Sequence, residues 1–288
     1  MKPESPPTIS VIIPTWNRAG MLRRAIDSAL AQTVPPLEIL VCDDGSEDGS
    51  EAIVAGYGDP IVQWLPGARG GRPAIPRNRG LQRVKGDWIA FLDSDDAWLP
   101  EKLEQQLTVA REHKVLACCT NAYRRRPNGD SDELMGQHDA ARFRFDDLMK
   151  RNFVICSSVI LHRSTIAAAG GFPEAAALRI GEDYAFWLRV ATTTDFYYLG
   201  TPLVNYLDDA ENSVRAHSLD GWSLRIEVLT NLLDWSRGQA VNAKRTTTIR
   251  AEIILARCRR ALAPAVRLLR RCGAEVKTSD ARGYHGNG

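Results

Sequence analysis

The chain has little that points to a membrane or to secretion. Its opening residues, MKPESPPTIS, contain no hydrophobic core of the kind found in signal peptides. A membrane-spanning helix needs about 20 consecutive apolar residues, and no segment approaches that length. We therefore expect a cytoplasmic protein that is at most peripheral on the inner face of the membrane.

Cysteine is scarce, and its spacing fits no known framework. The six cysteines show neither a CxxC pair nor a compact disulfide pattern. Because structural disulfides are rare in reducing compartments, this usage favours free thiols in such a compartment. The six are Cys42, Cys118, Cys119, Cys156, Cys258 and Cys272.

Two nucleotide-binding signatures are missing. No GxGxxG follows an apolar run, which argues against a dinucleotide-dependent oxidoreductase. Nucleotidyltransferases open with a glycine-rich, basic loop after the first strand, and PTWNRAG, residues 14–20, lacks that character. Internal repeats and low-complexity segments are also lacking.

The chain does contain a regular alternation of apolar runs and amphipathic segments. With 44% hydrophobic residues, 25% charged residues and a net charge of +2, it has an ordinary globular composition. Strands alternating with helices are typical of an open, mostly parallel α/β sheet, where ligands bind beyond the carboxyl ends of the strands. The expected strands are 9–14, 37–44, 61–65, 88–92 and 115–120, and the expected helices are 19–32, 48–55, 76–84 and 100–112.

The pattern loosens after Tyr123. Residues 124–143 are polar and broken by glycine and proline, so we expect a mobile loop there. A strand over 154–162, a helix from about Glu182 and two short strands within 196–206 follow. The chain is expected to be helical from Ser218 onward and disordered in the final GYHGNG.

The most informative stretch is WIAFLDSDDAWLPEKL, in which an apolar strand runs into acids. Asp93, Asp95 and Asp96 repel one another unless a cation lies among them. Carboxylates one residue apart suit Mg²⁺ or Mn²⁺, with water or substrate phosphate completing the octahedral shell. The alternative is that Asp95 or Asp96 caps the helix entered at Pro100, which explains one acid and not three.

FLDSDD resembles the DxD motif of GT-A fold glycosyltransferases, and further segments resemble the large inverting family two of that fold. In family order over residues 8–206, these segments are VIIPTWNR at 11–18, VCDDGSEDGS at 41–50, PRNRG at 76–80, with proline in place of the usual alanine, and GEDYAFWLRV at 181–190. Five motifs in order are far more specific than one.

The resemblance implies a GT-A, Rossmann-like sheet, open, mostly parallel and flanked by helices, with a helical C-terminal extension. We expect a nucleotide-sugar-binding half followed by an acceptor-binding half that carries the catalytic base. The expected divisions are a flexible tail at 1–7, the first half at 8–120, the second at 121–217, the extension at 218–280 and a disordered tail at 281–288.

The resemblance also implies a nucleotide-sugar pocket. Asp44 would accept from a pyrimidine ring N–H, which favours uracil or thymine over cytosine. Arg77 and Asn78 would lie near the base and the phosphates, because a planar guanidinium suits carbonyl and phosphate oxygens. The alternatives are that DDGS is only a turn and that Arg77 and Asn78 form a solvated surface pair. The implied residues are Pro14, Thr15, Asn17, Arg18, Asp44, Arg77, Asn78, Asp93 and Ser94.

A divalent cofactor, Mn²⁺ or Mg²⁺, is implied at the same place. Asp95 would be its direct ligand, and Asp93 would contact the metal or the ribose. His217, in NSVRAHS, could ligate the metal or touch the diphosphate, although a lone loop histidine often does neither.

Asp183 is the expected general base. Inverting sugar transfer needs one carboxylate to take the proton from the acceptor hydroxyl as the nucleotide leaves. Glu182 is assigned to acceptor binding or to support of Asp183. The alternative is that both acids only balance the positive end of a helix.

The remaining acceptor-side expectations concern Asp96, Trp187 and Trp98. Both indole rings could stack on an acceptor sugar, and their spacing suits core packing equally well. Asp96 stays open between a helix cap and an acceptor contact.

A basic segment near the C-terminus allows two interpretations. It suits a membrane-surface helix that holds the enzyme near a lipid-linked acceptor. It equally suits a solvated bundle helix, and Pro264 interrupts its pattern. Its basic residues are Arg257, Arg259, Arg260, Arg267, Arg270 and Arg271, set among Ile254, Leu255, Leu262, Val266, Leu268 and Leu269.

The sequence therefore predicts an inverting, metal-assisted glycosyltransferase. It would move a sugar by single displacement from a nucleoside diphosphate donor, UDP-linked by the argument on Asp44, to an acceptor hydroxyl. The acceptor would be a carbohydrate, a lipid-linked saccharide or another hydroxyl compound in polysaccharide or glycoconjugate synthesis, and no nucleic acid partner is expected. The alternative is a non-catalytic nucleotide-sugar-binding or scaffold subunit.

Overall fold

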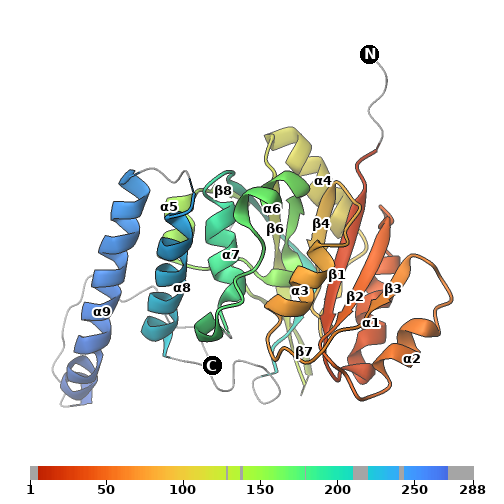
Figure 1. Cartoon of the computed structure of the whole chain (residues 1–288), viewed down its shortest axis with the longest axis horizontal. Coiled ribbons are helices and arrows are strands. Elements are labelled where there is room, and N and C mark those ends of the chain that lie inside the picture. The colour runs from red at the N-terminus through yellow and green to blue at the C-terminus, as the bar shows by residue number, and fades with distance from the viewer. Residues whose placement is uncertain are drawn as a thin grey trace.

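A computed structural model describes residues 6–127, 129–136, 139–178, 180–209, 220–239 and 243–271 (Figure 1). Within these residues, no helix has both the length and the apolarity needed to cross a membrane. His217 and the expected terminal tails, apart from residues 6 and 7, lie outside the described residues.

The first part of the chain alternates strands and helices. Its elements are β1 (Ile9–Thr15), α1 (Ala19–Leu30), β2 (Glu38–Asp43), α2 (Ser50–Ala55), β3 (Val62–Leu65), α3 (Ala74–Leu81), β4 (Trp88–Phe91), β5 (Ala97–Trp98) and α4 (Lys102–His113). These elements confirm the strands and helices predicted for this part, with ends shifted by a few residues.

The second part is less regular. Its elements are β6 (Ala117–Arg126), β7 (Gly129–Leu134), β8 (Ala141–Phe143), α5 (Phe145–Lys150), the 3-10 turn η1 (Cys156–Ser158), β9 (Ile160–His162), α6 (Arg163–Ala169), the 3-10 turn η2 (Ala176–Leu178), α7 (Glu182–Val190), β10 (Phe196–Leu207), α8 (Gly221–Ser236) and α9 (Ala243–Arg271).

One sheet runs through both parts in the order β3-β2-β1-β4-β9-β6-β10-β5, with β7 beside β6 and β8 beside β10. The pairs β1–β2, β1–β4, β2–β3 and β6–β10 are parallel, and β9 enters antiparallel between β4 and β6. The predicted open, mostly parallel sheet is confirmed. Its helices lie on both faces, and α8 and α9 stack outward on one side (Figure 1).

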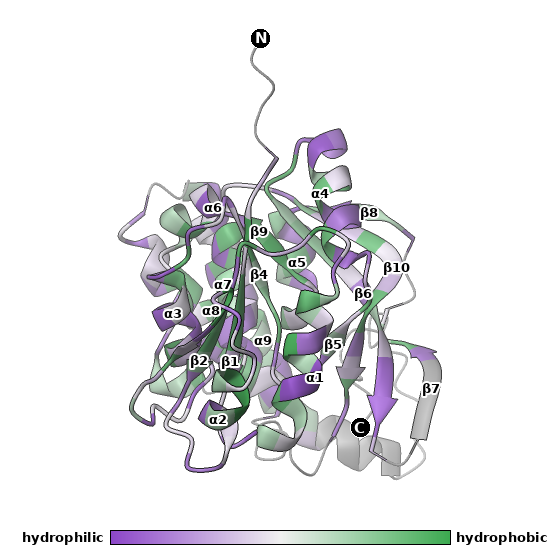
Figure 2. Cartoon of the chain, turned by 90° about the vertical axis from the view of Figure 1, so that its right-hand side faces the viewer, coloured by the Kyte–Doolittle hydropathy of each residue, from purple (hydrophilic) through white to green (hydrophobic). Residues whose placement is uncertain are grey.

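Side chains alternate along β1 between two cores, one on each face of the sheet. Val11 and Ile13 pack in a cluster with buried residues of α1, α2 and α4. Ile12 packs in a second cluster with α3, α5, α6 and α7, which extends to buried residues of α8 and α9. Figure 2 shows the hydrophobic colour concentrated along the central strands β1, β4 and β9. Both faces are covered, which explains why the strands read as unbroken apolar runs.

The expectation of a mobile loop over 124–143 was wrong. β6 continues to Arg126, and β7 returns beside it as a hairpin. Polar side chains stabilise this hairpin through ion pairs between its two strands. Glu133 lies 2.8 Å from Arg126 and 3.6 Å from Arg124. β8 then pairs with β10 within the same stretch.

Two smaller expectations also need correction. Only β9 at the end of 154–162 is a strand, because the Ser158 N–H donates to the Ile155 carbonyl and forms a 3-10 turn, which the Ser158 hydroxyl supports with a second bond to that carbonyl. Residues 196–207 form one strand, β10, with register shifts around Pro202 rather than a break. The predicted helical extension at the C-terminal end is confirmed in α8 and α9, and α9 continues through Pro264.

Candidate functional site

Three parallel strands, β2, β1 and β4, end side by side. Their carboxyl ends lead into residues 43–46, 15–18 and 93–96. The motifs VCDDGSEDGS, VIIPTWNR and FLDSDD therefore meet at one edge of the sheet. This edge is where open α/β sheets bind ligands.

Residues 93–96 form a tight turn, and Ser157 of η1 locks it. The Asp96 N–H donates to the Asp93 carbonyl over 3.0 Å. The Asp93 N–H donates to the Ser157 hydroxyl over 3.0 Å, and that hydroxyl donates to the Asp96 carboxylate. Asp96 is buried and also accepts from the Leu207 N–H. It therefore neither caps α4 nor reaches an acceptor, and the expectation for this residue was wrong.

Crowding of like charges shows in the acids of this turn. Burial raises the pKa of Asp95, the Asp93 carboxylate raises it further, and Arg18 opposes the rise. Burial, with the charges of Asp95 and Asp93, raises the pKa of Asp96 well above its usual range. The Arg18 guanidinium lies 3.7 Å from the Asp95 carboxylate, and Arg24 donates to the Asp95 carbonyl.

The strongest counter-charge comes from Arg77 of α3. Its guanidinium lies 2.6 Å from the Asp93 carboxylate and 2.8 Å from the Glu182 carboxylate of α7, and its side chain is 4% exposed. It also lies over the Phe172 ring, and among the described residues its Nε has no hydrogen-bond partner. Both ends of its fork hold carboxylates in this structure, and the base and phosphate contacts expected of Arg77 stay a prediction.

The start of α7 places the predicted base, Asp183, directly after Glu182, which ends this ion-pair chain. Gly181 precedes it with a φ of +85°, and a Cβ there would meet Leu224 at 2.9 Å, so glycine suits this position. Burial raises the pKa of Glu182 to about 7, the Asp183 carboxylate adds to the rise, and Arg77 opposes it. Asp183 is half-buried and accepts from the Tyr184 N–H over 2.6 Å.

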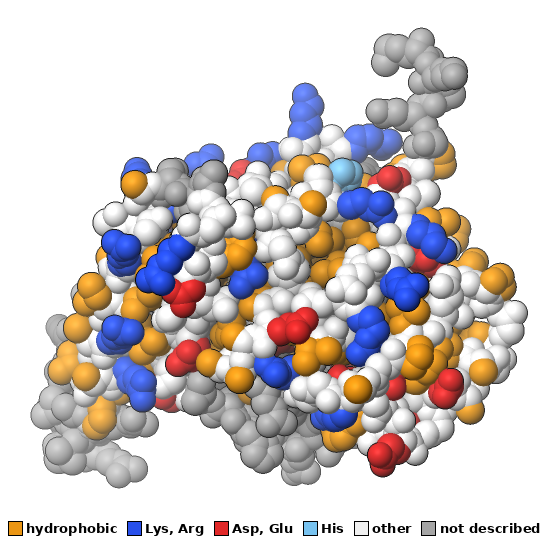
Figure 3. Space-filling model, in the orientation of Figure 1, with side chains coloured by type: hydrophobic (Ala, Val, Ile, Leu, Met, Phe, Trp, Pro, Cys, Tyr) orange, Lys and Arg blue, Asp and Glu red, His pale blue; other side chains and the backbone are white. Residues whose placement is uncertain are grey.

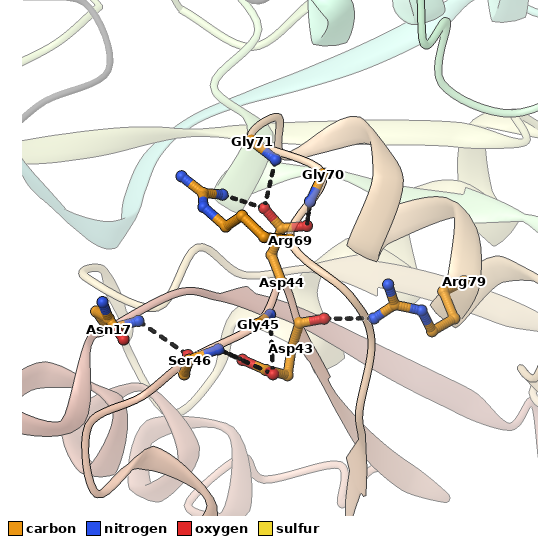
Figure 4. A network of polar contacts seen from close by, with 9 residues as sticks. All are labelled: Asn17, Asp43, Asp44, Gly45, Ser46, Arg69, Gly70, Gly71 and Arg79. Carbon is orange, nitrogen blue, oxygen red and sulfur yellow. Dashed lines mark hydrogen bonds and ion pairs between the residues drawn. The ribbon is translucent and has the colours of Figure 1, made fainter.

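At the end of β2, the chain itself fills the acceptors of Asp43 and Asp44 (Figure 4). Asp43 accepts from the N–H groups of Gly45 and Ser46. Buried Asp44 accepts from the N–H groups of Gly70 and Gly71, over 2.8 and 2.9 Å, and pairs with the Arg69 guanidinium.

The other predicted pocket residues lie around this edge. Pro14 and Ser94 are buried, and the buried Thr15 hydroxyl has no partner among the described residues. Asn17 is tied to the next loop: its backbone N–H donates to the Ser46 hydroxyl, and its side-chain Oδ1 accepts from the Glu47 N–H.

Asn78 is engaged elsewhere. Its amide donates to the Phe172 carbonyl and the Glu174 carboxylate and accepts from the Phe172 N–H. The segment that follows α6 uses both ends of the amide, and the place near the phosphates expected of Asn78 stays a prediction.

Neither tryptophan proposed for acceptor stacking is available. Trp187 is 0% exposed and packs among Phe91, Phe172 and Phe186. Trp98 is 4% exposed and donates from its indole N–H to the Ser157 carbonyl. Trp187 is therefore a core residue. Trp98 supports Ser157, the residue that holds the turn of residues 93–96.

The acids of the turn fit a divalent cation. Asp93 and Asp95 keep 28% and 31% of their side-chain surface exposed, and they provide hard oxygen ligands whose mutual repulsion a cation would relieve. Among the described residues, no group of three or more His, Cys, Asp or Glu side chains gathers around one point. Two carboxylates with substrate phosphates are therefore the ligand set that the chain offers.

A cavity of about 320 Å³ adjoins this turn. Its lining includes Arg24, which touches the Asp95 carbonyl, together with Arg125 and Arg126 from the end of β6. Three guanidinium groups suit an anionic ligand. Another cavity, of about 340 Å³, lies between α2 and β3, away from the acids.

Comparison with known proteins agrees with this arrangement. A family model described as glycosyl transferase family 2 matches residues 10–168. The putative teichuronic acid biosynthesis glycosyltransferase TuaG of Bacillus subtilis is 30% identical over 64% of this chain and 72% of its own length. The Escherichia coli UDP-Glc:alpha-D-GlcNAc-diphosphoundecaprenol beta-1,3-glucosyltransferase WfgD is 30% identical over 63% of this chain and 69% of its own.

Another relative matches a shorter stretch. An uncharacterized glycosyltransferase of Rickettsia typhi is 42% identical over 36% of this chain, and the match spans 32% of that protein. The chain therefore matches about a third of the length of this relative.

Solved structures share the fold. Staphylococcus aureus TarS 1-349 in complex with UDP-GlcNAc superposes with a TM-score of 0.69 at 20% identity, over 86% of this chain and 72% of that one. The Pyrobaculum calidifontis mannosyltransferase PcManGT, in complex with GDP-Man and Mn²⁺, gives 0.56 at 18% identity, over 94% and 81%. At these identities, the likeness concerns the fold.

Proposed function

The chain belongs to glycosyltransferase family 2, and on that premise we propose an inverting enzyme that moves a sugar from a UDP-linked donor to an acceptor hydroxyl. The observation that carries the proposal is the ion-pair chain from Asp93 through Arg77 to Glu182. It joins the donor-side acids of β4 to the helix that presents Asp183, although the two lie far apart in the sequence.

Asp183 is the proposed general base. It follows Glu182 at the start of α7, and its carboxylate is half-buried rather than sealed in the core. It would take the proton from the acceptor hydroxyl as that oxygen attacks the donor sugar and the nucleoside diphosphate leaves. One displacement inverts the sugar carbon and needs no second carboxylate as nucleophile, in contrast to retaining glycosidases.

Asp93 and Asp95 are the proposed ligands of Mn²⁺ or Mg²⁺. When bound, the ion would supply positive charge against the departing diphosphate. Arg77 holds the Asp93 carboxylate in an ion pair over 2.6 Å, and Ser157 fixes the backbone of the turn. The mannosyltransferase PcManGT, which shares the fold and was solved in complex with Mn²⁺, supports this role.

Asp44 is the proposed partner of the nucleotide base. Its carboxylate accepts from two N–H groups of residues 70 and 71, and a uracil ring N–H offers the same type of donor. The names of WfgD and of the TarS complex both contain a UDP-sugar, which supports uracil. The base would take over part of the bonding that the loop and Arg69 provide.

The acceptor is proposed to be a lipid-linked saccharide or a growing polysaccharide, because WfgD and TuaG are named for such products. We retain the division into a donor half over 8–120, an acceptor half over 121–217 and an extension over 218–280 as a proposal. One sheet spans the two halves, so they differ in role rather than in packing.

Transfer assays test the proposal. The purified chain should release UDP from UDP-glucose or UDP-N-acetylglucosamine in the presence of an undecaprenyl-diphosphate-linked sugar and Mn²⁺, and a chelator should abolish the release. Thermal shifts with each nucleotide sugar would identify the donor independently of the acceptor. Undiminished turnover without any divalent ion would remove the role of Asp95. Donor binding with no transfer to any acceptor would favour the non-catalytic alternative.

A further inference from the structure

The inner side of helix α9 packs against the rest of the protein. Ile249, Ile253 and Ala256 are buried, and the first two belong to the core shared with α8. Glu252, on the same side, lies 2.7 Å from Arg225 of α8, which is itself buried. These contacts fix which face of the helix points away from the protein.

The outward face is also apolar. Ala251, Ile254, Leu255, Cys258 and Leu262 are spaced three or four residues apart, so they form one stripe along the helix. Ile254 is 62% exposed, Leu255 40% and Leu262 60%. A helix that faces water on this side normally carries polar residues there. The stripe is therefore the contact surface for something apolar.

Arginines border the stripe on both sides. Arg250 and Arg257 lie one helical turn from Ile254, and Arg259 lies one turn beyond Leu255, with its guanidinium over the Trp222 ring. All three are exposed. Figure 3 shows hydrophobic and basic side chains side by side along the left edge, where α9 lies. The only acid between Ala243 and Arg271 is Glu252, which is paired with Arg225.

We propose that this face of α9 lies on an anionic lipid surface, with the apolar stripe in the acyl boundary and the arginines at the phosphates. Long basic side chains beside an exposed apolar stripe match a bilayer interface on both counts. A second copy of the chain is a poorer occupant, because two such faces would bring arginines against arginines. Residues 272–288 contain too few large apolar side chains, chiefly Val276 and Tyr284, to cover the stripe. The proposal goes beyond sugar transfer and does not depend on it.

Vesicle binding tests the proposal on the full chain. The protein should sediment with vesicles that contain about 30% phosphatidylglycerol and bind far less to pure phosphatidylcholine, since each basic residue near an anionic surface strengthens binding about fivefold. The double substitution of Arg250→Gln and Arg257→Gln should weaken binding about 25-fold. Substituting Ile254→Asn and Leu262→Asn should weaken it about tenfold per side chain.

Matched controls separate this face from the rest of the surface. Leu37→Asn removes a side chain that is 45% exposed elsewhere, and Arg83→Gln with Arg111→Gln removes two exposed charges, one from the turn after α3 and one from α4. Both controls should bind vesicles as the wild type does. Unchanged unfolding temperatures and UDP affinities in every variant would show that the fold and the donor site are intact.

Cys258 offers a direct readout of burial in the bilayer. It is the exposed member of the described cysteines, and Cys272→Ser leaves it as the one target for an environment-sensitive fluorophore. The emission should shift to the blue with anionic vesicles only. No shift, or equal loss of vesicle binding in the Leu37→Asn control, would overturn the proposal. A dimer that Ile254→Asn and Leu262→Asn convert to monomer would instead identify an interface between copies.

Discussion

Two groups of acids stand at the ends of β2 and β4, on either side of β1, and the protein neutralises them in different ways. At the end of β2, Asp43 and Asp44 accept mainly from backbone N–H groups of nearby loops, and Asp44 also pairs with the part-exposed Arg69 guanidinium (Figure 4). At the end of β4, Asp95 and Asp96 have raised pKa values, partly because Asp93 adds a third negative charge.

The difference indicates which kind of ligand each group can receive. Hydrogen bonds from N–H groups satisfy a carboxylate without adding charge, and another N–H donor such as a base can replace them. Crowded carboxylates need positive charge, which Arg77 supplies to Asp93 on the inner side. The outer surfaces of Asp93 and Asp95 remain part-exposed, which is where a divalent ion fits.

The largest expected effect is at the proposed base, Asp183, which follows the Glu182 that Arg77 links to Asp93. Asp183→Asn should lower transfer about 10³-fold, because an amide cannot accept the acceptor proton. Its affinity for UDP, measured by calorimetry, should match the wild type. Equal turnover in the variant and the wild type would assign the base elsewhere, and a lost UDP affinity would place Asp183 in donor binding.

A pair of arginine substitutions compares the two strand ends directly. Arg77→Met should lower the free energy of unfolding by about 3 kcal/mol, because it leaves Asp93 and Glu182 without their shared counter-charge. Arg79→Met, which removes only a hydrogen bond to the Asp43 carbonyl, should cost about 1 kcal/mol. Urea unfolding measures both.

Arg77→Lys serves as the rescue variant, since it keeps the positive charge and loses the two-pronged geometry. It should recover most of the stability lost in Arg77→Met and only part of the activity. Equal losses for Arg77→Met and Arg79→Met would mean that the two strand ends do not differ in their need for charge.

The pH dependence of stability isolates Glu182. Burial raises its pKa from 4.5 to about 7, so the folded state holds a proton that the unfolded state releases. Its stabilising contribution is therefore full below about pH 4.5 and is lost as the pH rises through about 7, up to about 3 kcal/mol. Glu182→Gln keeps the acceptor for Arg77 and should flatten this decline. The free energy of unfolding at about pH 5 and about pH 8 measures it. An unchanged slope in the variant would contradict the assignment.

The smallest expected effect concerns the loop of residues 69–72, whose N–H groups and Arg69 side chain bind the Asp44 carboxylate. Arg69→Ala removes a part-exposed partner that lies over the Trp16 ring, and UDP should bind up to about fivefold more tightly because it no longer competes with Arg69. Arg72→Ala, in the same loop but bonded to the Glu174 carbonyl, is the control. Weaker UDP binding by Arg69→Ala would show instead that Arg69 contacts the nucleotide.

The sequence predicted the strands that carry the acids because both faces of the sheet are buried, and burial leaves an unbroken apolar run. The hairpin of β6 and β7 was not predicted from the sequence, because ion pairs such as Arg126–Glu133, rather than apolar alternation, hold its strands. The polar surroundings of β7 therefore read as a loop.

Within the site, the positions of the acids could be predicted and their partners could not. Arg77 and Glu182 are brought together by folding across much of the chain, and nothing in the local pattern marks Ser157 as the lock of the acid turn. Trp187 fits a sugar platform and a core position equally well by spacing, and only its complete burial decides.

The central claim is that Asp93 and Asp95 share a divalent cation with the donor. Titration of Mn²⁺ into the chain with UDP, followed by the paramagnetic resonance of the free ion, measures this binding directly. The wild type and Glu51→Gln, which alters an exposed acid of α2, should bind the ion equally, and Asp95→Asn should bind it at least about tenfold more weakly. Equal Mn²⁺ affinity in Asp95→Asn and the wild type would contradict the account.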